Sequence, residues 1–214
     1  MENLPEEAPG MIATAKTPNG AEAVFIGVSA GGMDALRRVL APLPADFPAP
    51  VVVVQHLHAS QGDFLAEYLG RLCALRVKEA DDKDSLSPGV VYLAPPNYHL
   101  LVESDRSLSL STDDKVNHSR PSIDVLFESA AAAYGPGAVA VVLTGASRDG
   151  AEGLRLIREQ GGAAIVQDPA TAEHAFMPQA ALDCAGADHV LGLGDIGPKL
   201  VRLVTGRTVN GEAR

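Results

Sequence analysis

The sequence has few aromatic residues, few cysteines and no long apolar run. Its 214 residues include no tryptophan, five phenylalanines, four tyrosines and two cysteines, Cys73 and Cys184. A core without aromatic bulk must be built from Val, Leu, Ile and Ala, which is typical of a parallel sheet with helices on both faces. The two cysteines lie in apolar contexts and indicate buried thiols in a reducing compartment. No run approaches about 18 apolar residues, so the sequence predicts no membrane-spanning helix.

Positive charge is also scarce. Lys and Arg total 17 against 27 Asp and Glu, which gives a formal net charge of −10. This balance argues against nucleic acid or an anionic membrane as the main partner. Residues 1–7 are acidic and lack the apolar region of a secretory signal. We therefore expect a cytoplasmic protein with no nucleic-acid partner and no direct membrane insertion.

Apolar runs of strand length alternate with helical patterns along the chain. Such alternation predicts a doubly wound α/β domain with a mainly parallel sheet. Residues 100–103 and 108–111 alternate with period two and predict a short antiparallel hairpin. The expected ordered domain is 22–205, between flexible tails at 1–21 and 206–214. Expected strands are 23–28, 51–54, 90–94, 138–143, 163–166 and 189–191; expected helices are 31–40, 62–73, one from Pro121 capped by Ser119, 151–161, 178–184 and 196–204.

The turn after the first strand carries a serine between glycines. Gly27-Val28-Ser29-Ala30-Gly31 fits the G-x-S-x-G form of a nucleophile elbow, in which a strand turns sharply into a helix. The alternative is a turn that holds a phosphate at the helix N-terminus. However, the segment is not G-x-G-x-x-G, and the second strand ends in Gln55-His56 rather than in an acid for a ribose. The turn therefore predicts a nucleophilic serine.

Two further polar residues follow buried strands: His56 after 51–54 and Asp149 after 138–143. The carboxyl ends of parallel strands meet at one edge of a sheet, so Ser29, His56 and Asp149 can meet there. Imidazole can accept the serine proton, and a carboxylate can orient the imidazole. Two alternatives remain for these residues. Asp149 can simply cap the helix that follows it, and His56 with His58 and Asp149 can bind a metal. No further ligand cluster follows in the sequence, so we expect no metal and no cofactor.

The chain order Ser, His, Asp differs from the order Ser, Asp, His of the α/β-hydrolases, which excludes that family. Instead, a series of segments resembles, in order, the catalytic domain of the bacterial chemotaxis protein-glutamate methylesterases, the CheB family. The resemblance covers roughly residues 22–204. The matching segments are 27–32, Gln55-His56, 93–99, 116–127, 143–150 and Met177-Pro178.

This resemblance implies a serine hydrolase that removes methyl esters from glutamate side chains on the cytoplasmic domains of chemoreceptors. It also implies that glutamines of the receptor can be deamidated. The family's triad falls on Ser29, His56 and Asp149, and its oxyanion-hole donors fall on the backbone N–H groups of Ala30 and Ala146. Ala146 replaces a methionine that is common in the family.

Four other residues lie in matching segments: His99, His118, Arg120 and Met177. The first three either orient the substrate loop or hold the long connection between the hairpin and the next helix. Both roles remain open from the sequence.

Family members commonly carry an N-terminal receiver domain that gates the site. Only 28 residues precede Ser29, whereas such a domain needs about 100. We therefore expect either ungated activity or a regulatory partner protein in place of the receiver domain. Two functions of other classes are a catalytically idle adaptor that docks on a sensory receptor complex and a nucleotide-binding module. The presence of all three triad residues weighs against the adaptor.

Overall fold

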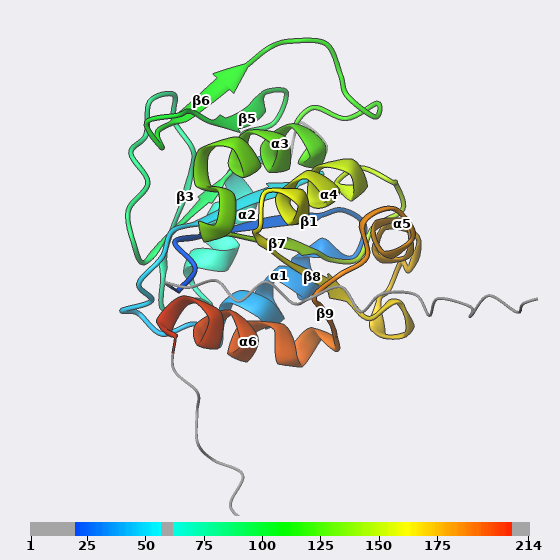
Figure 1. Ribbon diagram of the computed structural model, residues 1–214. Coiled ribbons are helices and arrows are strands. Elements are labelled where there is room, and N and C mark those ends of the chain that lie inside the picture. The colour runs from blue at the N-terminus through cyan, green and yellow to red at the C-terminus, as the bar shows by residue number, and fades with distance from the viewer. Residues whose placement is uncertain (1–19, 57–61, 207–214) are drawn as a thin grey trace, which may run out of the picture.

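The computed structural model describes residues 20–56 and 62–206. Its centre is a seven-stranded sheet in the order β3-β4-β2-β1-β7-β8-β9, with every neighbouring pair parallel (Figure 1). The strands are β1 (Ala23–Val28), β2 (Val51–Gln55), β3 (Arg76–Glu79), β4 (Val90–Leu93), β7 (Ala138–Val142), β8 (Ala163–Gln167) and β9 (His189–Leu191), and a separate antiparallel pair is formed by β5 (His99–Val102) and β6 (Leu108–Ser111).

In the described part of the chain, six α-helices cover the two faces of the sheet (Figure 1). They are α1 (Gly32–Leu40), α2 (Gly62–Gly70), α3 (Ile123–Tyr134), α4 (Ala151–Glu159), α5 (Phe176–Ala185) and α6 (Leu193–Thr205), with short 3-10 turns at Gly135–Gly137 and Pro169–Thr171.

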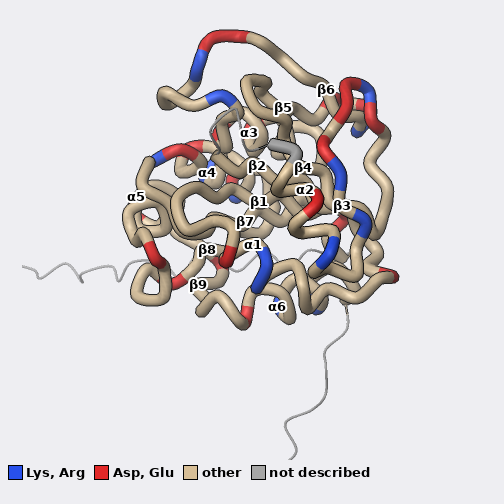
Figure 2. Tube along the Cα trace, turned by 180° about the vertical axis from the view of Figure 1, so that it is seen from behind, with Lys and Arg blue, Asp and Glu red and all other residues tan. Residues whose placement is uncertain are grey.

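The strand sequences explain this layering. Central strands β1, β2 and β7 carry no charged residue and are fully buried, while charged residues lie on the surrounding helices and loops and on strand β3 (Figure 2). Because successive side chains of a strand point to opposite faces, Val24 and Ile26 pack in one core with α1, α2 and α6. Ala23 and Phe25 pack in the other core with α3, α4 and α5. The predicted fold class, an aliphatic parallel sheet between helical layers plus a hairpin, is confirmed.

Several predicted boundaries were wrong. Strand β3 was missed because its sequence, Arg-Val-Lys-Glu, is polar and lies at the edge of the sheet, where one side of a strand has no partner. The helix expected from Pro121 begins at Ile123, and its N-cap is Ser122 rather than Ser119. The helix expected to reach residue 73 ends at Gly70.

Most residues of the two expected tails, together with His58, lie outside the described part of the chain. Ala21, which was placed in the N-terminal tail, is buried and donates its N–H to the Leu203 carbonyl. Among the described helices, none has the length and apolar character needed to cross a membrane. Residues 20–56 and 62–206 also contain no cluster of three metal-binding side chains.

The strand order determines where the polar strand ends meet. Strand β1 lies between β2 and β7, with Val28 paired to Gln55 and Gly27 paired to Val142. The residues that follow these three strands therefore come together at the carboxyl edge of the sheet. This is the edge at which open parallel sheets bind their ligands.

Candidate active site

Ser29 lies on a tight turn between β1 and α1. Its N–H donates to the Thr144 carbonyl, and its own carbonyl accepts from the N–H of Gly32, both at 3.0 Å. Gly31 has φ +78°, a left-handed conformation that favours glycine. The turn thus connects the serine directly to the first residue of α1.

The loop after β7 approaches Ser29 closely because it contains Gly145. A Cβ on Gly145 would lie 2.9 Å from the Ser29 Cβ and 2.7 Å from the Met177 Cε. A residue with a Cβ at position 145 would therefore force one of these side chains to move. The loop that leads to Asp149 is therefore packed against the serine turn, with Met177 buried beneath it.

His56 follows β2 directly, and its N–H donates to the Val28 carbonyl at 3.0 Å. Its Nε2 lies 2.9 Å from Oδ2 of Asp149. The imidazole is only 14% exposed. Because Nε2 faces the carboxylate, Nδ1 is the ring nitrogen left for another partner. An imidazole held in this way can act as a general base.

Asp149 is completely buried and collects hydrogen bonds from several groups. Its Oδ2 accepts from the Ile123 N–H at 2.7 Å, and its Oδ1 accepts from the Ser122 hydroxyl at 2.7 Å, the Asn117 amide at 2.9 Å and the Asp124 N–H at 3.2 Å. Two of these donors are free N–H groups at the start of α3, where a helix favours negative charge.

The alternative in which Asp149 caps the following helix is therefore wrong. The N-cap of α4 is Gly150, and the side chain that accepts an N–H from the first turn of α4 is Asp124, which binds Gly153 at 2.7 Å. The carboxylate of Asp149 instead accepts from the first turn of α3, which precedes it in the chain.

Two carboxyl groups at this edge have opposite pKa shifts. Burial alone would raise the pKa of Asp149, but hydrogen bonds from His56, Asn117, Ile123 and Ser122 outweigh it and hold that pKa below its usual value. Asp149 is therefore ionised at neutral pH. Burial raises the pKa of Asp124, and the N–H of Gly153 only partly offsets that effect.

Gln55, the last residue of β2, links the serine turn to the histidine. Its buried amide nitrogen donates to the Ser29 carbonyl at 2.8 Å and to the His56 carbonyl at 3.0 Å. Its Oε1 is buried without a hydrogen-bond partner in the described chain and faces Gly32, where a Cβ would lie 1.8 Å away. The sequence signal for this link is a polar residue that ends a buried run of valines.

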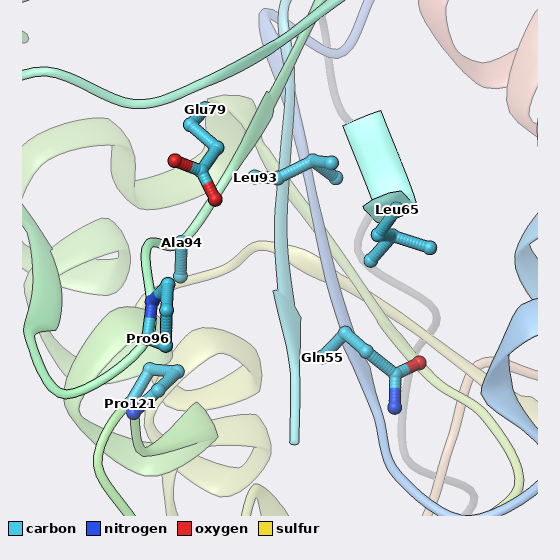
Figure 3. Close-up of a pocket in the computed structure, with 7 residues that line it drawn as sticks. All are labelled: Gln55, Leu65, Glu79, Leu93, Ala94, Pro96 and Pro121. Carbon is cyan, nitrogen blue, oxygen red and sulfur yellow. The ribbon is translucent and has the colours of Figure 1, made fainter. Parts of the chain in front are cut away.

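A pocket lies beside Gln55, toward β4 (Figure 3). In the figure, Gln55 and Leu65 lie on one side of the pocket, and Glu79, Ala94, Pro96 and Pro121 lie on the other. Glu79 is the one charged residue in a lining that is otherwise mostly apolar: Gln55, Leu65, Leu93, Ala94, Pro96 and Pro121.

The structure shows what the other expected site residues contact. The buried His99 accepts the Ser122 N–H at Nδ1, so its proton is on Nε2, which donates to the Asp114 carbonyl at 3.0 Å. Arg120 donates from Nη1 to the carbonyls of Thr112 and Asp113. His118 is exposed. His99 and Arg120 thus contact the connection between β6 and α3.

Sequence reasoning missed three groups at this site: the Gln55 amide, the Asn117 amide and the Ser122 hydroxyl. Asn117 and Ser122 lie within a segment that the sequence had marked for other residues, His118 and Arg120. Nothing in the spacing of that segment indicates which side chain reaches Asp149.

Comparison with known proteins gives a consistent result. The family model described as CheB methylesterase matches residues 24–200. A Leptospira interrogans protein, provisionally named protein-glutamate methylesterase/protein-glutamine glutaminase, is 49% identical over 85% of this chain and 94% of its own length. Proteins with that name from Moorella thermoacetica and Pseudomonas aeruginosa are 45% and 44% identical over 87% and 83% of this chain. The chain spans only 45% and 48% of those two relatives.

A solved structure shows the same fold. The crystal structure of the Thermotoga maritima CheB methylesterase catalytic domain superposes with a TM-score of 0.83 and is 37% identical. The match covers 86% of this chain and 99% of that domain. The family model matches most of this chain, residues 24–200, and one relative is 49% identical. The chain therefore belongs to the CheB methylesterase family.

Proposed function

We propose that this protein is a cytoplasmic serine hydrolase that removes methyl esters from glutamate side chains of chemoreceptors and can deamidate receptor glutamines. One observation carries the proposal: the buried pair of His56 and Asp149 lies at the sheet edge where the Ser29 turn ends. Family membership and the names of the relatives support the substrate class. An idle adaptor is not favoured, since it would need no buried imidazole–carboxylate pair.

The proposed reaction is acyl transfer through Ser29. His56 takes the hydroxyl proton at Nδ1 while Ser29 Oγ attacks the ester carbonyl, and Asp149 stabilises the imidazolium that forms. The tetrahedral intermediate collapses with loss of methoxide, which His56 protonates to methanol. Water, deprotonated by His56, then hydrolyses the glutamyl ester of Ser29. A glutamine substrate would follow the same steps with ammonia as the leaving group.

Two backbone N–H groups are proposed as the oxyanion hole, those of Ala30 and Ala146. Ala30 follows the serine, and the peptide that carries its N–H is held at the Ser29 carbonyl, which accepts from the Gln55 amide at 2.8 Å and from the Gly32 N–H at 3.0 Å. Within residues 20–56 and 62–206, no acceptor takes either N–H. Both donors are therefore free for a developing oxyanion, and each such donor is typically worth about 3 kcal/mol of barrier.

The substrate proposal is tested by product release. We expect the full chain to release methanol from receptor cytoplasmic domains methylated with labelled methyl groups, and to release ammonia from the matching unmodified receptor glutamines. Intact methyl esters after prolonged incubation with folded protein would contradict the proposal.

A second prediction concerns Gly32. In Gly32→Ala the new Cβ would lie 1.8 Å from Gln55 Oε1, so the amide must move and release the Ser29 and His56 carbonyls. A misplacement of about 1 Å near reacting groups can cost roughly 100-fold in rate. We expect kcat for methanol release to fall by about that factor.

The matched control for Gly32→Ala is Gly70→Ala. Gly70 is the last residue of α2, and the atom nearest to an added Cβ is 3.9 Å away. The control should retain the full kcat. Equal kcat values for the two variants would show that the Gln55 link does not matter to catalysis.

A further inference from the structure

The segment between β6 and α3 makes a tight turn at Val116–Ser119. The N–H of Ser119 donates to the Val116 carbonyl at 2.9 Å, and the reverse bond is 3.2 Å. The two central residues, Asn117 and His118, have φ +50° and +64°. Positive φ at both central positions is the pattern of a type I′ turn, and asparagine is one of the few residues that adopt it at small cost.

This turn is tethered close to the active site. Arg120 holds the carbonyls of Thr112 and Asp113, and His99 holds the carbonyl of Asp114. The chain then passes through Ser122, whose hydroxyl donates to Asp149. The backbone on both sides of Asn117 is therefore fixed relative to the catalytic edge.

The Asn117 side chain lies between two carboxylates. Its Nδ2 donates to Asp149 Oδ1 at 2.9 Å and to Asp124 Oδ2 at 2.7 Å. Both hydrogens of the amide are thereby used. The amide oxygen would repel both carboxylates, so the orientation of the side chain is determined. Asp124 in turn accepts the Gly153 N–H at 2.7 Å, which extends the link to α4.

We propose that Asn117 is a positioning residue that acts through Asp149: its amide withdraws part of the negative charge of that carboxylate and so sets how strongly Asp149 stabilises protonated His56. The proposal rests on the proposed function, because His56 is the general base of that reaction. It assigns a role to a residue that neither the sequence motifs nor the comparisons single out.

The distribution of donors on Asp149 carries the inference. Oδ1 accepts from Asn117, Ser122 and the Asp124 N–H, while Oδ2 accepts from His56 and the Ile123 N–H. Each donor stabilises the negative charge of the carboxylate. Each donor therefore weakens the attraction between that charge and the imidazolium of His56. Removal of the Asn117 amide leaves the other donors to hold Asp149 in place, and leaves more negative charge facing His56.

The charged groups around Asp149 do not withdraw negative charge from it as the Asn117 amide does. Asp124, on α3, is a carboxylate whose charge acts on Asp149 and which Asn117 also binds. Arg148 precedes Asp149, but its charge acts on Glu152 of α4 and Cys184 of α5. His56 contacts the Asp149 carboxylate directly, and Asn117 is a neutral donor between that carboxylate and Asp124.

The test uses Asn117→Gly, which removes the amide and tolerates a positive φ. In the full chain, the imidazole of His56 is titrated by NMR, with its signal assigned from a His56→Gln variant. We expect the midpoint of this titration to lie at higher pH than in the wild type. The acid limb of the kcat/KM profile for methanol release should move upward by the same amount, with KM unchanged.

Two further variants sharpen the result. Asn117→Asp keeps the size and turn preference of the residue but replaces the donor with a third carboxylate, and it should raise the pKa of His56 further. Lys83→Gly changes another residue with positive φ, +68°, whose N–H donates to the Leu108 carbonyl of β6, and it should leave the titration unchanged. A His56 titration that is unchanged or moves to lower pH in Asn117→Gly would overturn the proposal. Because the NMR titration needs no turnover, absence of methanol release by the wild type would count only against the proposed function.

Discussion

Replacement of Ser29 by Ala should abolish methanol release while leaving the fold intact. The variant loses only the hydroxyl oxygen, and the hydrogen bonds that hold the turn use the backbone N–H and carbonyl of residue 29, which alanine retains. Loss of a nucleophile of this kind typically costs on the order of a million-fold in kcat. We expect release to fall below detection, with a melting temperature close to that of the wild type.

Ser104→Ala is the matched control, because Ser104 is exposed in the turn between β5 and β6. It should release methanol at the rate of the wild type. If Ser29→Ala retained more than a small fraction of wild-type turnover, the nucleophile would have to be another group.

Asp149→Asn is expected to damage both activity and stability. A neutral amide holds the imidazole in the wrong tautomer, which in a serine triad costs about 10,000-fold in kcat. The amide NH₂ would also replace one of the two carboxylate oxygens, and it would then face either the donors of Oδ1, among them the Ser122 hydroxyl, or those of Oδ2, among them the Ile123 N–H. Unsatisfied buried donors cost about 1–3 kcal/mol each, so a loss of about 3 kcal/mol is expected. In a chain of this size, that corresponds to a decrease in melting temperature of roughly 6–12 °C.

The control for this variant is Asp168→Asn. Asp168 also accepts a backbone N–H, from Ala170 at 2.9 Å, but it is partly exposed and lies at a short 3-10 turn. Its variant should unfold within about 2 °C of the wild type. Equal melting temperatures for Asp149→Asn and the wild type would contradict the role of Asp149 at the start of α3.

The stability effect of Asp149 should also depend on pH. The pKa of Asp149 lies below its usual value in the folded protein, whereas an unfolded aspartate titrates near about 3.9. Its contribution is therefore fully present above about pH 4 and is lost as the pH falls toward the folded pKa. The difference in unfolding free energy between wild type and Asp149→Asn, measured by denaturant titration, should be large at pH 7 and smaller at pH 3.

Much of the fold could be predicted from the sequence because its central strands are continuous β-branched runs. The runs at 23–28, 51–54 and 138–143 are buried on both faces, and a parallel sheet places their carboxyl ends together. The juxtaposition of His56 and Asp149 follows from that rule. Strand β3 could not be predicted from the sequence, because a polar edge strand has no periodic pattern of apolar residues.

The surroundings of Asp149 were less accessible to sequence reasoning. Its donors come from residues 25 to 32 positions earlier in the chain. They reach it through a connection fixed by single contacts, such as Arg120 with two carbonyls, rather than by a repeated pattern. For the same reason the sequence assigned Asp149 either to the following helix or to His56, whereas the carboxylate serves His56 and the preceding helix.

The central claim is that Ser29 is a nucleophile activated by His56 and Asp149. The most direct measurement is reaction of the full chain with a serine-reactive phosphonate, followed by mass spectrometry of the digested protein. We predict a single covalent adduct on Ser29 that forms rapidly in the wild type, does not form in His56→Ala and is unaffected by a chelator. An adduct on a different residue, or equal labelling of Ser29 in His56→Ala, would contradict the account.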